Sequence, residues 1–421
     1  MAGSLLLSSL LLATDANATN GYFQPGYGTR TKALAGAGVA GAGDAMTIAL
    51  NPAGLTLVGD SMDAGISLFS PRRSYEATGG TPAAFLATGR VDSGREAFPI
   101  PYAGISYKID DDSAWGIALY GNGGMNTSYP AVSRQCYDPG SMSMLPGAGI
   151  FCAGEAGVDL TQLFIAPAYA RNLTDKLSIG ISPIFSVQWF SAKGVQSFAM
   201  LSGDPAHLSN NGKNYSFGAG LRIGVQYEVS DGLRIGVAAV SPIYMTRFKD
   251  YAGLFAEHGK FNIPPAVTVG AAINLDDTKT LFVDYQHIWY DSVRSVGNPF
   301  ASPGPLGADN GPGFGWQDIG TIRIGFLWQA SDKWSFRAGY AYNDQPIPES
   351  EVLFNVLAPG VVQHHITGGI SRRISEKTQL HFAALYAPEA GVTAPNPFDA
   401  SQTIRIQMHQ YEATIGISHD F

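Results

Sequence analysis

The last eleven residues of the chain alternate in polarity with a period of two. Odd positions from Tyr411 to Phe421 are mostly apolar, whereas even positions such as Glu412, Thr414 and Asp420 are polar. Successive side chains of a strand point to opposite faces, so this segment has one apolar face and one polar face. A soluble edge strand of this kind would be prone to aggregation. The pattern suits a strand of a membrane barrel, which contacts lipid outside and a polar lumen inside.

The composition agrees with a membrane barrel. Only 14% of the 421 residues are charged, against about 25% in ordinary soluble domains, and 51 residues are glycine. We find no run near the ~18 apolar residues that a membrane-spanning helix needs. A chain crosses a bilayer only as helices or as a closed barrel, so membrane location here implies a barrel. The net charge of −8 offers no basic surface, and we expect no nucleic-acid partner.

A regular succession of short turns and long loops predicts the number of strands. Short polar turns lie at residues 110–113, 172–176, 230–232, 276–279, 331–333 and 375–377. Six hairpins contain twelve strands, and a first strand near 63–74 and a last near 408–421 bring the count to fourteen. The predicted fold class is all-β: a transmembrane antiparallel β-barrel of about fourteen strands over residues 61–421. The long connections, at 75–98, 126–158, 194–214, 296–315, 346–361 and 391–402, are expected outside the cell.

Two segments precede the predicted barrel. Residues 1–18 are typical of a signal peptide, with an apolar core from Leu5 to Leu12 and a small-residue cleavage site at Ala16–Ala18, although no basic residue precedes Arg30. A disordered apolar tail is the alternative. Residues 19–60 are rich in glycine and alanine and lack strand alternation, which favours a plug, or hatch, inside the lumen. A flexible periplasmic tail is the alternative, but residues 33–55 are too apolar to favour water.

The two cysteines lie close together in a stretch rich in proline, glycine and serine. In an oxidising compartment, Cys136 and Cys152 are expected to form a disulfide that closes a surface loop. The loop-entropy contribution would be about 3 kcal/mol. We expect no metal site here, because no histidine or third cysteine is nearby.

Several motifs give the chain a specific resemblance. They are Gly26–Gly38, Gly43–Ala45 and the run Asn51, Pro52, Ala53, Gly54, Leu55, followed by Trp115–Ala118, Gly121–Met125, Lys333–Gly339 and Asp344–Pro348. In these motifs the chain resembles the FadL/TodX family of outer-membrane transporters for long-chain fatty acids and hydrocarbons. The resemblance covers nearly all of the chain after the signal peptide. It implies a Gram-negative outer-membrane barrel of fourteen strands, plugged by a hatch that contains Asn51–Gly54, and passive passage of apolar molecules.

The glycine-rich run in the third predicted strand comprises Gly121, Asn122, Gly123 and Gly124. Glycines inside a strand weaken pairing and often mark a bulge or bend. In the resembling family this strand kinks inward and opens a lateral hole, through which an apolar ligand leaves into the membrane. An early end of the strand is the alternative interpretation.

The predicted alternation points two kinds of side chain into the lumen. The charged set is Arg222, Glu228, Arg234, Asp284, Arg323, Arg337 and Glu412. Charges at membrane depth are tolerated when they face the interior and find partners. We expect them to hold the hatch by bonding its free backbone groups, with binding of a substrate carboxylate as the alternative. The apolar set, Phe164, Ile184, Phe190 and Leu327, predicts an apolar upper lumen that binds ligand, or else packs against the hatch.

No enzyme motif is present. The chain has neither a Gly-x-Ser-x-Gly nor a His-Glu-x-x-His sequence, the pair His364–His365 points to opposite strand faces, and Ser371 and His381 have no supporting pattern. We therefore predict a monomeric outer-membrane channel, without cofactor or metal, for passive uptake of hydrophobic small molecules. Long-chain fatty acids are the first candidate, and monoaromatic hydrocarbons fit the same fold. An open porin for small polar solutes and an adhesin or purely structural barrel remain as alternatives.

Overall fold

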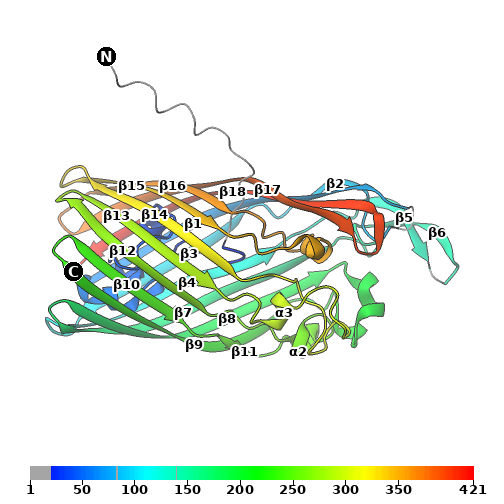
Figure 1. The fold of residues 1–421 in the computed structure, drawn as a ribbon, viewed down its shortest axis with the longest axis horizontal. Helices are drawn as coiled ribbons and strands as arrows, with labels where there is room; N and C mark the ends of the chain where they lie inside the picture. The colour runs from blue at the N-terminus through cyan, green and yellow to red at the C-terminus, as the bar shows by residue number, and fades with distance from the viewer. Residues whose placement is uncertain (1–19, 82–83, 139) are drawn as a thin grey trace, which may run out of the picture.

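The computed structural model describes residues 20–81, 84–138 and 140–421, so the predicted signal peptide lies outside the described residues. Fourteen antiparallel strands close into a barrel (Figure 1). They are β1 (Ser61–Gly79), β3 (Phe98–Lys108), β4 (Ser113–Asn126), β7 (Gly157–Thr174), β8 (Leu177–Lys193), β9 (Asn214–Ser230), β10 (Leu233–Val240), β12 (Ala266–Asp276), β13 (Lys279–Ile288), β14 (Ile319–Gln329), β15 (Trp334–Asn343), β16 (His364–Arg373), β17 (Thr378–Asn396) and β18 (Asp399–Asp420). Each barrel strand pairs with its neighbours in sequence, and β18 pairs with β1. The predicted strand count and fold class are confirmed.

The six predicted short turns join six hairpins of the barrel, and the chain ends near them (Figure 1). One predicted long loop is wrong. Residues 391–402 belong largely to β17 and β18, which are joined by only two residues, 397 and 398. The strands continue because the alternating residues Val392, Ala394, Ile404 and Ile406 remain buried beyond the membrane-facing part of the barrel. β1 likewise extends to Gly79.

Alternation along the strands separates a lipid-like exterior from a packed interior. In β14, Ile322 and Ile324 are exposed, whereas Arg323 between them is buried. Exposed aromatic side chains lie at two levels of the barrel wall: Trp115, stacked on Tyr107, lies near the short turns, and Tyr386 and Tyr411 lie midway along β17 and β18. Such girdles mark the two membrane interfaces of outer-membrane barrels.

Long connections cover the end of the barrel opposite the short turns (Figure 1). They contain β2 (Gly89–Asp92), β5 (Ser133–Asp138), β6 (Ser143–Ala148), β11 (Tyr244–Met245), α2 (Ala256–Gly259), α3 (Arg294–Gly297), α4 (Val352–Asn355), and the 3-10 helices η3 (Gln196–Leu201), η4 (Pro205–His207), η5 (Lys249–Tyr251) and η6 (Glu349–Glu351). β5 and β6 form a separate hairpin that projects beyond the barrel.

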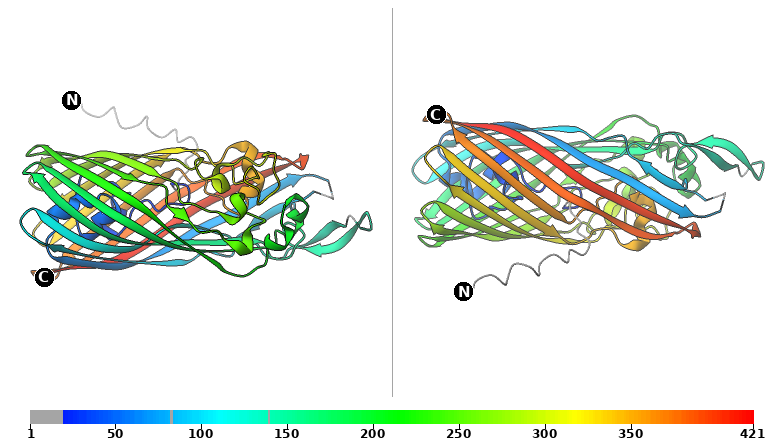
Figure 2. Two further views of the ribbon diagram at one scale, coloured as in Figure 1. Left: turned by 90° about the horizontal axis from the view of Figure 1, so that it is seen from below. Right: turned by 90° about the horizontal axis from the view of Figure 1, so that it is seen from above.

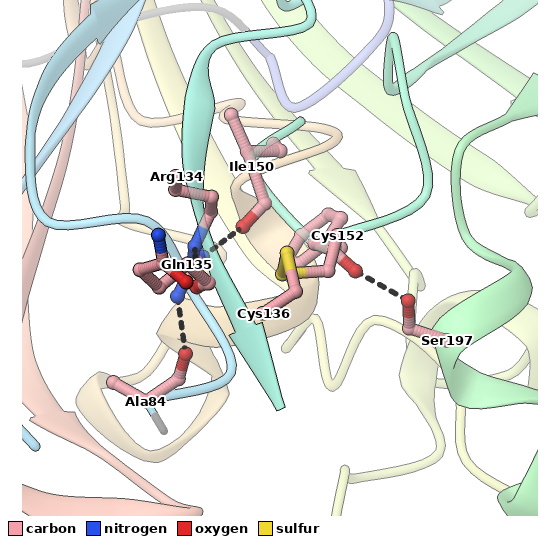
Figure 3. Close-up of a disulfide and its surroundings, with 8 residues drawn as sticks. Ala84, Arg134, Gln135, Cys136, Ile150, Cys152 and Ser197 are labelled. Carbon is pink, nitrogen blue, oxygen red and sulfur yellow. Dashed lines mark hydrogen bonds between the residues drawn. A yellow bond between two sulfur atoms is a disulfide. The ribbon is translucent and has the colours of Figure 1, made fainter. Parts of the chain in front are cut away.

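The structure contains the expected disulfide between Cys136 and Cys152, whose Cα atoms lie 5.8 Å apart (Figure 3). It fastens the β5–β6 hairpin to the chain that follows the hairpin. Arg134 secures the same region by donating hydrogen bonds to the carbonyls of Ile150 (2.9 Å) and Ala84 (2.6 Å). The hairpin is thus attached at its base.

Residues 20–60 lie inside the barrel, at the end that carries the short turns (Figure 2). They form α1 (Thr29–Lys32), η1 (Ala45–Ala49) and η2 (Pro52–Leu57), connected by irregular backbone. Asp44 and Asn51 begin the two 3-10 helices, because their side chains accept hydrogen bonds from the amides of Met46 and Ala53. In the described part of the chain, no helix is long and apolar enough to cross a membrane.

Candidate functional site

The ladder between β3 and β4 is incomplete. The two strands pair from Lys108 with Ala114 to Tyr102 with Tyr120, and their pairing stops there. β4 does not end at this point: it continues to pair with β7 as far as Asn126, with a bulge between Gly121 and Gly123. The remaining residues of β3, 98–101, pair with β1 alone among the described strands. The hydrogen-bond ladder of the barrel therefore has a gap between β3 and β4.

Two prolines explain why the ladder does not resume. Just after β3, the amide of Ile109 donates to the carbonyl of Ser113, and hydrogen-bonded positions alternate along an antiparallel pair. Odd-numbered amides of β3 therefore face β4. In a continued register Pro99 and Pro101 would face Gly123 and Gly121. Proline has no N–H to donate, so both prolines remove a bond on the same edge of β3.

The N-terminal segment takes the place of β3 along the free edge of β4. The amide of Gln24 donates to the carbonyl of Asn122 (3.1 Å), and the amide of Gly124 donates to the carbonyl of Tyr22 (3.2 Å). A Cβ atom on Gly123 would lie 1.8 Å from the carbonyl oxygen of Tyr22, so only glycine fits there. β4 is therefore turned toward the lumen, where its backbone is bonded.

The buried side chain of Asn122 extends this connection into the lumen. Its Nδ2 atom donates to Gln162 (2.9 Å), and its Oδ1 atom accepts from the hydroxyl of Tyr27 (3.0 Å). The bend of β4 and the N-terminal segment are thus joined by both backbone and side-chain hydrogen bonds.

A cavity of about 240 Å³ lies at the gap. Its walls are mainly apolar and include Phe69, Phe98, Ile100, Met125 and Trp316, together with Gly121, Gly123 and Gly124. Two charged side chains also line it, those of Arg73 and Glu412. The loss of side chains at the three glycines leaves room for the cavity directly inside the wall.

The gap lies at the level of the lipid-facing side chains. Pro99 and Pro101 pair across β1 with Leu68 and Ile66, which are 55% and 44% exposed. The nearest outward aromatic residue on β18, Tyr411, pairs with Ser70 and so lies further toward the long loops. The unpaired stretch therefore lies beside the apolar band of the barrel, on the short-turn side of Tyr411.

Three residues of the predicted charged set bind the N-terminal segment. The Oδ2 atom of Asp284 accepts hydrogen bonds from the amides of Gly38 (2.8 Å) and Val39 (2.9 Å). Arg222 donates to the carbonyl of Ile48 (3.1 Å). Glu412 forms a buried ion pair with Lys32.

The other four charged residues have partners on the barrel itself, which differs from the expectation that they bond backbone groups of the hatch. Glu228 and Arg234 pair with each other at 3.1 Å. Arg323 donates to Gln286, and Arg337 donates to Ser371 at 2.7 Å. The alternation placed all seven inward, but these four bond to neighbours on the barrel strands, and the buried Nε atom of Arg323 has no partner among the described residues.

The shape of the segment around Asn51 depends on the amide side chain of this residue. Its Nδ2 atom donates to the carbonyls of Val39 (2.8 Å) and Val225 (3.1 Å), while its Oδ1 atom accepts from Ala53. Pro52 and Gly54 are buried beside it, with Pro52 at the start of η2. Asn51 thus links two parts of the N-terminal segment to β9.

The four predicted apolar residues occupy different places. Phe164 packs edge-on against Tyr120 and lines a cavity of about 40 Å³ in the middle of the lumen. Ile184 is fully buried in the core. Phe190 lies among loop aromatic residues, 4.6 Å from the ring of Phe255, and lines a second cavity of about 40 Å³.

Leu327 does not belong to an upper lumen. It lies two residues before the end of β14 at the short-turn end of the barrel, where it packs against the cluster of Leu34, Ala37 and Phe282. Its inward orientation agrees with the alternation, but its height in the barrel separates it from Phe164 and Phe190. Leu327 therefore fits the alternative interpretation, in which the apolar side chains pack against the N-terminal segment.

Sequence reasoning missed four residues of this site: Lys32, Arg73, Pro99 and Pro101. The prolines carried a usable signal, because two prolines spaced by two residues in one strand remove donors from one edge. Arg73 occupies an inward position of β1, which the same alternation would have found. Nothing in the sequence pairs Lys32 with Glu412, 380 residues away.

The fold and the site define the class of protein. A closed barrel of fourteen strands with an apolar exterior and an N-terminal segment inside its lumen is an outer-membrane β-barrel. The chain belongs to the family described as outer membrane protein transport protein (OMPP1/FadL/TodX), whose model matches residues 10–412.

Individual relatives are distant in sequence. A putative outer membrane protein of Neisseria meningitidis serogroup B, NMB0088, is 22% identical over 85% of this chain and 83% of its own length. Among solved structures, the toluene transporter TodX of P. putida is 17% identical, with a TM-score of 0.67 over 94% of this chain and 99% of its own. A FadL homologue of Pseudomonas aeruginosa is 14% identical, with a TM-score of 0.67 over 95% of this chain and all of its own. These structures share the fold.

Proposed function

We propose that this chain is a monomeric channel for passive uptake of hydrophobic small molecules across the outer membrane. In this proposal residues 1–18 are removed as a signal peptide, residues 19–60 act as a hatch, and ligand leaves sideways between β3 and β4. The observation that carries the proposal is the unpaired stretch of wall beside an apolar cavity of about 240 Å³. An apolar solute gains free energy by entering the bilayer rather than the aqueous periplasm, so a lateral exit suits it.

The interior supports a route to this exit. Loop aromatic residues, including Phe190, Phe255 and Phe354, surround an apolar cavity at the loop end. Phe164 lines the cavity in the middle of the lumen, which also contacts Phe23 and Asn122. Phe23 and Gln24 line both the central cavity and the cavity at the gap. Movement of these residues would connect the two cavities without moving the barrel strands.

Long-chain fatty acids are our first candidate for the substrate, and monoaromatic hydrocarbons are the second. An apolar cavity of about 150 Å³ is sufficient for benzene, and the cavity at the gap is larger. TodX and a second similar structure, TbuX of Ralstonia pickettii (TM-score 0.64, 19% identity), are toluene transporters, which favours hydrocarbons as the substrates of those proteins. Arg73, a cation in the lining of the cavity at the gap, favours an acid.

Two other functions receive less support. An open porin needs an unobstructed lumen, whereas residues 20–58 fill the end of this lumen near the short turns. An enzyme needs an oriented base. His381 contacts Ser371 (2.8 Å), but its other nitrogen contacts Ser418 (2.9 Å) and no described carboxylate orients it. We therefore propose transport without catalysis, cofactor or metal.

The proposal is tested by filling the cavity at the gap. Cells that lack other hydrophobic uptake systems would express the chain, and uptake of radiolabelled oleate and toluene would be measured. Ile100→Trp adds volume inside the cavity, and Ile117→Trp adds the same volume on the lipid face of β4. We expect saturable uptake that falls at least about tenfold in Ile100→Trp and persists in Ile117→Trp. Equal uptake by both variants contradicts lateral exit, and a steady ion conductance without uptake of either compound contradicts the transporter.

A further inference from the structure

Arg73 is a buried cation at the wall of the cavity at the gap. Its side chain extends inward from β1 and only 8% of the residue is exposed. One guanidinium nitrogen, Nη1, donates to the carbonyl of Asn126, and the guanidinium lies 5.7 Å from the centre of the Phe98 ring. Its Nε and Nη2 atoms donate no hydrogen bond to the described residues. These atoms are available to a ligand in the cavity.

Arg73 differs from the arginines around it in lacking an acidic partner. Arg72 pairs with Glu96, Arg90 with Asp92, and Arg95 with Asp159. No carboxylate in the described ranges lies within ion-pair distance of Arg73. A buried charge without a partner is costly, which is why buried charges are normally paired. An unpaired guanidinium at a cavity is therefore a candidate ligand-binding group.

The remaining charge of the cavity is already neutralised. Glu412, the other charged residue in the lining, forms its ion pair with Lys32. Arg73 thus supplies the uncompensated charge of an otherwise apolar cavity. A ligand complementary to this arrangement has an anionic head and an apolar tail, because guanidinium groups bind carboxylate and phosphate oxygens with two parallel hydrogen bonds.

Arg73 also contacts a second space. It lines a polar groove of about 380 Å³ on the outer surface, together with Arg72, Glu96 and His409. The guanidinium therefore lies between the interior cavity and the exterior of the barrel. An anionic amphipath can approach it from the lumen or from the membrane surface.

We propose that Arg73 binds the anionic head group of an acyl-chain amphipath whose tail occupies the apolar cavity at the gap. This inference rests on the proposed transport function and narrows it to acids. A free fatty acid supplies the anion as a carboxylate from the lumen, and an anionic phospholipid supplies it as a phosphate from the bilayer. The chemistry at Arg73 is the same in both cases, and the experiment separates the two sources.

The test uses the purified full-length protein in nanodiscs and three probes: oleate, oleyl alcohol and dioleoylphosphatidylglycerol. Affinity is measured for the native protein, Arg73→Met, Arg73→Lys and the matched control Arg72→Met, whose side chain is exposed and paired with Glu96. Folding of each variant is checked by heat-modifiable migration in SDS gels. A charge-assisted hydrogen bond contributes about 1.5–3 kcal/mol, which corresponds to at least about tenfold in affinity.

We expect Arg73→Met to weaken binding of oleate at least about tenfold and to change binding of oleyl alcohol less than about twofold. Arg73→Lys should restore part of the affinity, and Arg72→Met should match the native protein. An effect on the phospholipid alone identifies an anionic lipid of the bilayer as the source of the anion, and an effect on oleate identifies a free fatty acid. Unchanged binding of both anions, or an equal loss for oleyl alcohol, overturns the proposal.

Failure of the inference can be distinguished from failure of transport. If the native protein takes up toluene while Arg73→Met binds oleate normally, the chain is a channel for neutral compounds and the role of Arg73 is overturned. If the native protein takes up neither oleate nor toluene, the transport function itself is overturned.

Discussion

The Oδ2 atom of Asp284 accepts a hydrogen bond of 2.8 Å from the backbone amide of Gly38. The contact joins β13 to the segment inside the lumen, and the neighbouring amide of Val39 donates to the same atom at 2.9 Å. An irregular backbone has amides without partners of its own, and a carboxylate is the strongest acceptor available to them. Asp284 therefore helps to fix the position of the N-terminal segment against the barrel wall.

Replacement of Asp284 by alanine is expected to loosen this segment without unfolding the barrel. Two hydrogen bonds to a charged group are lost, at about 1.5–3 kcal/mol each. We expect a larger and noisier ion conductance in planar bilayers, and faster tryptic cleavage at Arg30. Asp332→Ala, in an exposed turn, is the matched control. Native conductance in Asp284→Ala would show that other contacts suffice to hold the segment.

The ion pair between Lys32 and Glu412 is expected to show strong coupling. Removing one partner leaves a buried charge unpaired, which typically costs about 3–5 kcal/mol, whereas removing both is much less costly. Stability against guanidinium chloride would be compared for Lys32→Met, Glu412→Gln and the double variant. We expect the double variant to be more stable than Lys32→Met. Additive losses in the cycle would mean that the two side chains act independently.

The prolines of β3 are expected to keep the gap open. Replacing both Pro99 and Pro101 by valine restores two N–H donors on the edge that faces β4, and valine favours strands. The ladder should then extend toward Gly121, with a fall in hydrophobic uptake of at least several-fold. Pro167→Val with Pro183→Val is the control, because β7 and β8 resume their pairing on both sides of those prolines. Amide hydrogen exchange would report the new bonds, and fast, unprotected exchange of the new amides at positions 99 and 101 of the variant would contradict the prediction.

Removal of the disulfide is expected to affect the projecting hairpin and not the barrel. The loop-entropy contribution of a bridge of this span is about 3 kcal/mol, and it acts on residues 136–152. Cys136→Ser with Cys152→Ser should become sensitive to trypsin at Arg134, while heat-modifiable migration in SDS gels stays native. Treating the native protein with a reducing agent should give the same result. A shift in barrel migration would indicate that the hairpin supports the barrel itself.

The strand pattern was readable because it follows from one local rule. A residue such as Arg323 between Ile322 and Ile324 has a single orientation compatible with lipid outside, so alternation placed it correctly. Alternation does not predict how far along the barrel axis a side chain lies, or which residues it contacts. Leu327 and Phe190 both face inward, yet they lie at opposite ends of the barrel.

The contacts of the N-terminal segment escaped sequence reasoning for a different reason. That segment has irregular backbone, so no periodicity fixes which of its groups meets which strand. Lys32 forms an ion pair with Glu412, and Asn51 donates a hydrogen bond to the carbonyl of Val225, only because the closed barrel brings distant strands together around one small volume. The loop predicted at 391–402 is wrong because β17 and β18 continue past the membrane-facing part of the barrel, where they bury residues against the long connections.

The ladder between β1 and β18 runs without interruption from Ser61 with Asp420 to Gly79 with Gln402. Two strands, β1 and β3, lie between this ladder and the gap. A barrel changes its circumference most readily where hydrogen bonds between strands are missing. The wall should therefore deform most easily at the unpaired edges of β3 and β4. Radial strain, whether from a passing ligand or from a thinner bilayer, would be absorbed in that sector. The ladder between the first and last strands, β1 and β18, would then keep its geometry while the neighbouring wall deforms.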